Sequence, residues 1–251
     1  MTCYLIFFII GLFFGSFLNI VICRFPKMKG VLWGRSYCPK CKKIIPVYDL
    51  LPLVSYIILG GKCRFCKKTI SVQYPLVELA TGFLFVLACY IFGFDISLIF
   101  YLPIFMLLVL IFSFDLKYLE IPEVFSWLFL IFAIIIGFAA NIYTLDNFLL
   151  GGLVGGGILG ILVGISNEQW MGSGDIKIGL GFGFLLGFPR ALLFVFLSFI
   201  LGAIFGIIVL ALKKGILKSQ LPFAPFLIIS ALICLMFGEK IIEIYSTFAI
   251  I

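Results

Sequence analysis

The chain contains no histidine among its 251 residues. This absence excludes a Ser-His-Asp triad, a Cys-His dyad and a His-Glu-x-x-His zinc protease, because each of these sites takes a general base or a metal ligand from histidine. Any acid–base chemistry must therefore use Asp, Glu, Lys, Tyr or Cys. Carboxylates inside or at the edge of a membrane are the candidates to examine, since ionisable groups there are costly and usually functional.

Charged residues are also scarce: they make up 12% of the chain, whereas 64% of it is hydrophobic. A soluble domain of this length needs more polar surface, so the composition predicts an all-α, polytopic membrane protein. The first apolar run lacks the basic stretch and the cleavage site of a secretory signal and is interpreted as a retained helix. About eight transmembrane helices are predicted, the sixth being the shortest, over residues 1–23, 79–94, 96–114, 124–145, 147–167, 178–189, 191–212 and 219–238.

The positive charges predict the orientation of these helices. Of the 18 Lys and Arg residues, 11 lie between Arg24 and Lys68, where Asp49 is the only acid. Placing this loop in the cytoplasm puts the N-terminus outside, and only Arg190 and Lys240 then lie in external loops. The net charge of +7 is thus explained by topology and by attraction to anionic membrane lipid, and not by nucleic-acid binding. The cytoplasmic loops after the first are predicted at 115–123, 166–175 and 213–218.

The eight cysteines fall into two groups. Four lie in or next to apolar segments and are interpreted as small buried hydrophobic residues: Cys3, Cys23, Cys89 and Cys234. The other four form two Cys-x-x-Cys pairs in the basic loop, the spacing of a structural zinc site: Cys38, Cys41, Cys63 and Cys66. Two disulfides are the alternative, which a reducing cytoplasm disfavours. With four protein ligands a zinc site is closed, so we expect it to fold the loop and not to act as a Lewis acid.

Two aspartates lie at the predicted cytoplasmic edge of the membrane. Asp115 ends the third apolar segment and Asp175 begins the sixth, within Gly172-Ser173-Gly174-Asp175. The two glycines are expected to allow backbone conformations closed to other residues and a close approach to another segment. If adjacent, the two carboxylates would share one proton, as in aspartic proteases.

A helix-dipole argument separates the two roles. Asp115 lies at a helix C-terminus, which disfavours negative charge, and Asp175 lies at an N-terminus, which favours it. Asp175 is therefore expected to activate water and Asp115 to protonate the scissile carbonyl. Taken singly, Asp175 is equally explained as an N-cap and Asp115 as a solvated loop residue. Other carboxylates on the same side are alternatives: Asp49, Glu120, Glu123 and Glu168.

Motifs along nearly the whole chain resemble the type IV prepilin peptidases. The sequence from Gly15 to Ile22 is followed by Arg24-Phe25-Pro26, the tetracysteine loop and Tyr74-Pro75-Leu76-Val77-Glu78. The two aspartate motifs follow, Asp115 with Ile121-Pro122 and Gly172-x-Gly174-Asp175-x-Lys177. The late element Pro222-Phe223-Ala224-Pro225-Phe226 completes the resemblance. The chain departs from the family pattern at Asp49-Leu50-Leu51-Pro52 and at Glu123.

The resemblance implies an enzyme of the bacterial inner membrane that cuts the basic leader from prepilins or pseudopilins of type IV pilus and type II secretion systems. Asp115 and Asp175 would be catalytic, supported by Gly172, Gly174 and Lys177. Many members also methylate the new N-terminus with S-adenosylmethionine, for which the candidates here are Gly15, Asn19, Arg24 and Glu78. The corresponding division is a first helix (1–23), a cytoplasmic zinc-binding domain (24–74) and a peptidase domain (75–251).

Three alternatives remain at this point. The first is a methyltransferase-only or inactive relative, against which both aspartates argue. The second is a non-enzymatic transporter or assembly scaffold with a zinc knuckle, although transporters usually carry internal repeats and mid-membrane charges. The third is another intramembrane aspartyl protease, against which the tetracysteine loop argues. The glycine-rich segment 151–164 lacks the Gly-Lys-Ser/Thr ending of a phosphate loop and is expected to pack closely against another helix.

Overall fold

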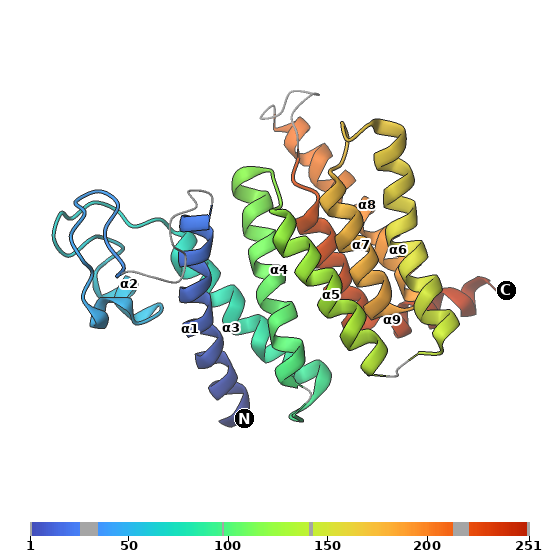
Figure 1. Cartoon of the computed structure of the whole chain (residues 1–251), viewed down its shortest axis with the longest axis horizontal. Coiled ribbons are helices and arrows are strands. Elements are labelled where there is room, and N and C mark those ends of the chain that lie inside the picture. Colours follow the sequence, from blue (N-terminus) through green and yellow to red (C-terminus); the bar gives the residue numbers. More distant parts are fainter. Residues whose placement is uncertain (1, 26–34, 97, 141–142, 213–220, 250–251) are drawn as a thin grey trace. The chain divides into compact units, whose positions relative to one another are not determined.

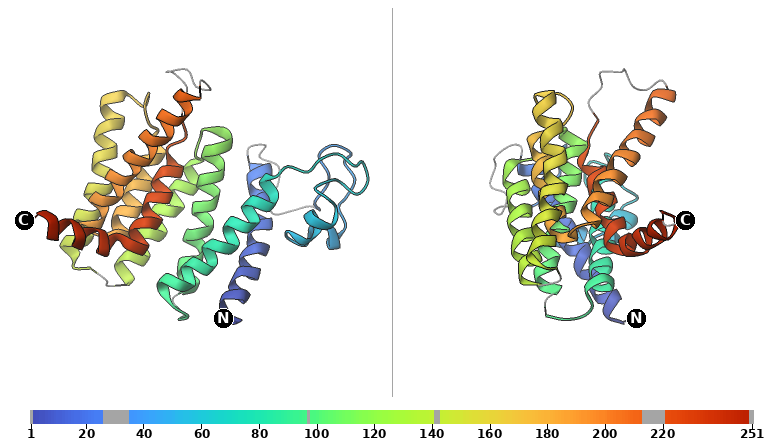
Figure 2. Two further views of the ribbon diagram at one scale, coloured as in Figure 1. Left: turned by 180° about the vertical axis from the view of Figure 1, so that it is seen from behind. Right: turned by 90° about the vertical axis from the view of Figure 1, so that its right-hand side faces the viewer.

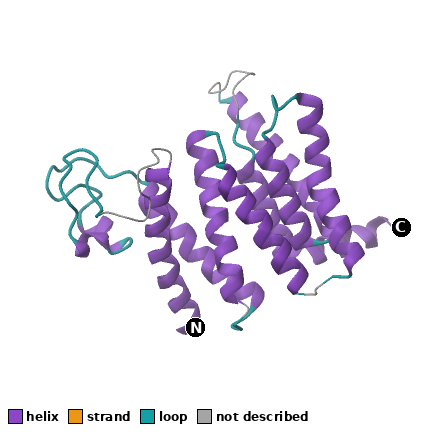
Figure 3. Ribbon diagram, in the orientation of Figure 1, coloured by secondary structure: helices purple, strands orange, loops and turns teal. Residues whose placement is uncertain are grey.

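The computed structural model describes residues 2–25, 35–96, 98–140, 143–212 and 221–249. Within these ranges the backbone forms helices and loops, and the only β-pairing is two isolated bridges in the cysteine loop (Figure 3). The predicted loop 213–218 lies outside the described residues. The helices are α1 (Thr2–Arg24), the 3₁₀ helix η2 (Val47–Leu50), α2 (Val54–Ile58), α3 (Gln73–Phe92), α4 (Leu98–Tyr118), α5 (Glu123–Ala139), α6 (Leu145–Ser166), α7 (Ser173–Leu186), α8 (Arg190–Ala211) and α9 (Ala224–Ala249) (Figure 1).

The predicted all-helical, polytopic class is confirmed. Each of the eight predicted segments overlaps one of the longer helices, α1 and α3 to α9. Six of these helices are long and apolar enough to cross a membrane, whereas α5 has 17 residues and α7, the predicted short sixth segment, has 14. The predicted count of about eight spans therefore matches the number of longer helices, but only six have the length of a full span. α7 also starts at Ser173 and not at residue 178, which places Asp175 inside the helix.

The chain forms two compact units, Met1–Ser113 and Phe114–Ile251. In the first unit, α1 packs directly on α3 because glycines remove the side chains between them. A Cβ at Gly11 would lie 2.7 Å from the Cα of Gly82, and a Cβ at Gly15 would lie 2.6 Å from the Cα of Glu78. Leu18, Ile22 and Phe85 complete this interface as buried side chains. The division into domains predicted from the sequence stays a prediction.

In the second unit, α6 packs on α7 through glycines on both helices. A Cβ at Gly155 would lie 2.4 Å from the carbonyl oxygen of Gly179, and one at Gly151 would lie 2.5 Å from that of Gly183. Such spacing brings two backbones into direct contact. The expected close packing of segment 151–164 thus holds for its N-terminal half. At Gly157 and Gly164, a Cβ would meet nothing within 4 Å.

Three helix ends come together at one end of this second unit. They are the last turn of α4, the first turn of α7 and the first turn of α9, and they carry the two aspartates and the late Pro-Phe-x-Pro element (Figure 2). α4 ends just before Leu119, which has a φ of 55°, and Pro122 precedes the next helix as its N-cap residue. Proline and a left-handed residue are both helix-ending signals.

Candidate active site and metal centre

Asp115 lies in the last turn of α4 and is held by the start of α9. Its side chain is buried, and Oδ2 accepts a hydrogen bond from the backbone N–H of Ala224 at 2.9 Å. The backbone of Phe223 also hydrogen-bonds to this carboxylate. The first N–H groups of a helix have no partner inside the helix, so a carboxylate placed there satisfies them and is favoured by the helix dipole. Asp115 therefore serves as the N-terminal cap of α9, although it is more than a hundred residues away in sequence.

Asp175 lies in the first turn of α7 and is equally buried, with 6% of the residue exposed. Its Oδ1 has no hydrogen-bond partner among the described residues. The carboxylate interacts electrostatically with that of Asp115. Because a buried polar atom usually has a partner, an orphan carboxylate oxygen beside a second carboxylate makes this pair a candidate functional site.

Burial separates this pair from the alternative carboxylates. Among the acidic residues that the structure describes, only Glu78, Asp115 and Asp175 are buried. Glu120, Glu123 and Glu168 are exposed. Glu123 and Asp49 are each in an ion pair with a basic side chain. Buried, interacting carboxylates are therefore found only at Asp115 and Asp175 within the second unit's described residues.

The expected reason for the two glycines before Asp175 is wrong. Gly172 has a φ of −83°, which any residue adopts, and Gly174 is not among the residues with positive φ. A Cβ at Gly174 would lie 3.5 Å from the Cβ of Ile121, an ordinary contact, and one at Gly172 would meet only the Gly174 nitrogen at 4.0 Å. The glycines leave space beside the aspartate, and they do not mediate a close helix contact.

Lys177 points to α5. Its ammonium forms an ion pair with Glu123 and lies 4.9 Å from the ring centroid of Trp127. Both partners lie in the first turns of α5, so these contacts fix the start of α7 against that helix. Lys177 is thus placed to position Asp175, two residues before it.

The helix-dipole assignment made from the sequence stays a prediction, and the structure adds a contact that it did not include. That argument placed Asp115 only at the C-terminus of α4, but the N-terminus of α9 lies against the same carboxylate. Asp115 accepts backbone hydrogen bonds that favour its ionised form, whereas Asp175 has an oxygen without any. The α9 contact could not be derived from sequence order, although Pro225, which has no N–H, marks the first turn of a helix.

The cysteine loop brings the four predicted metal ligands together. The Sγ atoms of Cys38, Cys41, Cys63 and Cys66 all lie within 4.8 Å of one another, and those of Cys38 and Cys66 are 3.9 Å apart. Four thiolates around a zinc ion with bonds of about 2.3 Å lie about 3.8 Å apart in a regular tetrahedron. The donor set and its spacing therefore fit a tetrahedral metal ion.

The two Cys-x-x-Cys pairs adopt the same local structure, 25 residues apart. The N–H of Cys38 donates to the carbonyl of Lys43, and the N–H of Cys63 donates to that of Lys68. The residue after each pair is left-handed, with a φ of 60° at Lys42 and 57° at Lys67, and no residue type at these positions predicts it. Backbone N–H groups of Cys66 and Phe65 lower the pKa of the Cys63 thiol to about 7.

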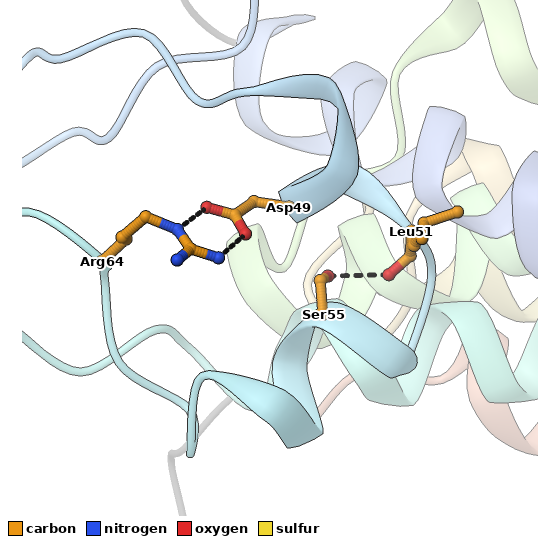
Figure 4. A network of polar contacts seen from close by, with 4 residues as sticks. All are labelled: Asp49, Leu51, Ser55 and Arg64. Atoms are coloured by element: carbon orange, nitrogen blue, oxygen red, sulfur yellow. Dashed lines mark hydrogen bonds and ion pairs between the residues drawn. The ribbon is translucent and has the colours of Figure 1, made fainter.

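A bidentate ion pair joins the second knuckle to η2. Arg64 donates to both carboxylate oxygens of Asp49 at 2.6 and 2.7 Å, as Figure 4 shows. The guanidinium also lies over the ring of Tyr48, 5.2 Å from its centroid. This hydrogen bonding lowers the pKa of Asp49 below its ordinary value. The departure from the family pattern at Asp49-Leu50-Leu51-Pro52 therefore leaves the aspartate with a structural partner.

Of the four residues predicted to contribute to N-methylation, three lie together between α1 and α3, namely Gly15, Asn19 and Glu78. Asn19 donates to the carbonyl oxygens of Gly15 and Tyr74, and Glu78 accepts from the N–H of Leu53 at 2.9 Å. Arg24 lies at the end of α1 and donates to the carbonyl of Arg35. The described contacts of Asn19 and Glu78 are thus made within the protein, and they assign these side chains to helix and loop packing.

Comparison with known proteins shows which family the chain belongs to. The model of the bacterial peptidase A24 N-terminal domain matches residues 9–92, and that of the type IV leader peptidase family matches residues 100–207. A prepilin leader peptidase/N-methyltransferase of Bacillus subtilis is 32% identical over 98% of this chain and 98% of its own length. The chain belongs to the type IV leader peptidase family. A relative with the same description from Pseudomonas aeruginosa is 31% identical over 96% of this chain and 92% of its own length.

Membership of the type IV leader peptidase family argues against a transporter or scaffold. The Peptidase A24 match covers Asp115 and Asp175, and the N-terminal match covers all four knuckle cysteines. A Legionella pneumophila prepilin leader peptidase/N-methyltransferase is 30% identical over 94% of this chain and 93% of its own length. No solved structure matches the chain.

Proposed function

We propose that this member of the type IV leader peptidase family is a prepilin leader peptidase of the inner membrane, with Asp115 and Asp175 as its catalytic pair. Prepilins or pseudopilins are the proposed substrates. The observation that supports the pair is its geometry: two buried carboxylates interact at the ends of two helices, and one of them has an oxygen without a partner. The positive charge of the loop between α1 and α3 supports a cytoplasmic location for this loop, with the N-terminus outside.

The environments of the two aspartates suggest how the peptide bond is hydrolysed. Asp115, favoured as the anion by the N-terminus of α9, takes a proton from water while the water oxygen attacks the scissile carbonyl carbon. Asp175 carries the proton shared by the pair and gives it to the carbonyl oxygen. When the tetrahedral intermediate collapses, the C–N bond breaks and Asp115 returns its proton to the leaving amine. One of the two hydroxyl groups on the carbon gives its proton back to Asp175 as the new carboxyl group forms. The leader carries the new carboxylate, and the pilin carries the new amine.

The tetracysteine cluster is proposed to hold a structural zinc ion. The four thiolates would be its ligands, and the ion would fix both knuckles, and so the loop between α1 and α3. The site has no open position, so no step of peptide hydrolysis is assigned to it.

N-methylation of the new N-terminus is proposed as a second activity, because the similar enzymes are described as N-methyltransferases. S-adenosylmethionine would supply the methyl group. Since Asn19 and Glu78 are engaged within the protein, no step is derived through that cofactor, and Gly15, Asn19 and Glu78 are proposed to support the fold of the first unit.

The test is cleavage of a purified prepilin by the wild-type enzyme and by the variants Asp115→Ala, Asp175→Ala and Glu120→Ala in detergent. Glu120 is an exposed acid five residues from Asp115 and serves as the matched control. We expect both aspartate variants to lose at least about a thousandfold in kcat, because general acid–base catalysis contributes about that much, while Glu120→Ala keeps its rate. Folding is checked by size-exclusion chromatography and thermal unfolding.

Near wild-type cleavage by either folded aspartate variant would remove that residue from the catalytic pair. Cleavage lost in Glu120→Ala but retained in Asp115→Ala would transfer the role to the neighbouring carboxylate. Loss of cleavage in all three variants would point to a general effect on this end of the second unit.

A further inference from the structure

α2 presents an apolar face that no described residue covers. The exposed fractions are 51% for Val54, 75% for Ile57 and 74% for Ile58. These residues are spaced i, i+3 and i+4, so they lie on one side of the helix. The other two residues of α2 are engaged: Ser55 Oγ donates to the carbonyl of Leu51 (Figure 4), and the Tyr56 ring lies against Gly61.

A hydrogen bond fixes the start of α2 beside the membrane helices of the first unit. The N–H of Leu53 donates to Glu78 Oε2 at 2.9 Å, and the Cα of Glu78 lies against Gly15 of α1. Gly15 precedes Arg24, the last residue of α1, by nine residues. At a rise of about 1.5 Å per residue, this contact lies about 13 Å inside the end of the helix.

The level of α2 therefore overlaps that of a helix that is long and apolar enough to cross the membrane. Figures 1 and 2 agree: in each view the ribbon of α2 lies at the height of α1 and not beyond its C-terminal end. Because α1 is long and apolar enough to cross a membrane, an exposed apolar face at this depth is expected to meet lipid.

The same loop is basic on either side of α2 in the sequence. Lysines on both knuckles and directly after α2 are exposed, namely Lys40, Lys42, Lys43, Lys62, Lys67 and Lys68. Within residues 35–72 the only acid is Asp49, which Arg64 neutralises. Basic side chains next to an inserted apolar face are attracted to anionic headgroups, and long lysine side chains reach the headgroups from a deeper backbone.

We propose that α2 is a membrane-interface anchor that inserts Val54, Ile57 and Ile58 into the acyl chains of an anionic bilayer, while the lysines of the knuckles bind its headgroups. The anchor and the Leu53–Glu78 hydrogen bond together hold the tetracysteine loop against the membrane. The anchor requires no prepilin and no catalysis, so it stands or falls separately from the proposed function.

The test uses a single-tryptophan probe in the full-length enzyme. The three native tryptophans are replaced by phenylalanine, and Ile57→Trp or Phe65→Trp is added in turn. Phe65 is the matched control, because it is an exposed apolar residue of the same loop, but Lys43 lies over its ring and charged residues flank it. Each protein is reconstituted into vesicles of phosphatidylethanolamine and phosphatidylglycerol with or without brominated acyl chains, and in parallel into phosphatidylcholine alone. Size-exclusion chromatography and thermal unfolding of each variant, and of the tryptophan-free protein, show that both units are folded.

We expect brominated lipid to quench the tryptophan at position 57 at least about threefold more than that at position 65, and acrylamide to quench the two in the opposite order. Quenching at position 57 should fall when phosphatidylglycerol is omitted and in the variant Glu78→Ala, which lacks the carboxylate that accepts the Leu53 N–H and fixes α2. Equal lipid quenching at both positions overturns the proposal. The proposal is also overturned if acrylamide quenches the tryptophan at position 57 freely without prepilin and less after a prepilin is added. That result would make the face a protein-docking surface. If Ile57→Trp fails to fold, the same comparison is made with Ile58→Trp.

Discussion

The carboxylate of Asp115 accepts the backbone N–H of Ala224, the first residue of α9, at 2.9 Å. One side chain thus takes part in the proposed catalytic pair and also caps a helix of 26 residues. The contact explains why Pro222-Phe223-Ala224-Pro225-Phe226 belongs to the site, because the element starts a helix at Asp115. It also sets the two aspartates apart, because Asp175 has one carboxylate oxygen without a partner.

This difference predicts unequal effects of the two alanine variants on stability. Asp115→Ala leaves the first N–H groups of α9 without a partner and should lower the free energy of unfolding by about 1–2 kcal/mol, the usual cost of losing a cap. Asp175→Ala removes a buried carboxylate of which one oxygen has no partner, and should therefore lower the free energy of unfolding less. Thermal unfolding in one detergent measures both. Equal destabilisation by the two variants would contradict the capping role of Asp115.

The glycines of α6 make a second prediction with a control on the same helix. In Gly155→Ala the new Cβ meets the carbonyl of Gly179 at 2.4 Å, so α6 and α7 must separate, at a cost of about 1–3 kcal/mol. Because α7 carries Asp175, cleavage should fall as well. Gly157→Ala meets nothing within 4 Å and should be neutral or stabilising by up to about 1 kcal/mol. Thermal unfolding and prepilin cleavage of both variants check this, and a destabilised Gly157→Ala would show that α6 faces a partner at that position too.

The sequence was sufficient for features that depend on local pattern. Apolar runs gave the eight helices in order, and the Cys-x-x-Cys spacing gave four sulfurs that lie together. The features it missed are contacts between segments far apart in the chain. The cap of α9 by Asp115 joins residues 109 positions apart, and the Leu53–Glu78 hydrogen bond joins residues 25 positions apart. The hydrophobic periodicity of a sequence does not predict such contacts. The glycines before Asp175 were misjudged for a related reason, since the space beside a residue depends on which segment packs there.

The two groups of cysteines should differ in metal binding. In Cys63→Ser one of four clustered ligands is replaced by a hydroxyl, which binds zinc poorly, so the zinc content of the purified enzyme should drop to near zero. Cys89 is buried in α3, outside the cluster, and Cys89→Ser should keep its zinc. Elemental analysis of both proteins, purified together without chelator, gives the comparison. Full zinc content in Cys63→Ser would exclude the tetracysteine site.

The Asp49–Arg64 pair predicts a pH dependence confined to the cysteine loop. Hydrogen bonding from Arg64 lowers the pKa of Asp49 in the folded state, whereas an unfolded aspartate titrates near about 3.9. The stabilisation is therefore fully present above about pH 4 and is lost as the pH falls through the lowered pKa. Asp49→Asn should be less stable than the wild type above about pH 4, and the difference should shrink below it. Protonation of the thiols acts on both proteins alike and cancels in the comparison.

Limited proteolysis of the loop across a pH series measures the difference, and Asp146→Asn, at an exposed acid in the first turn of α6, is the control. A difference that does not change with pH would mean that Asp49 acts by its shape and not by its charge.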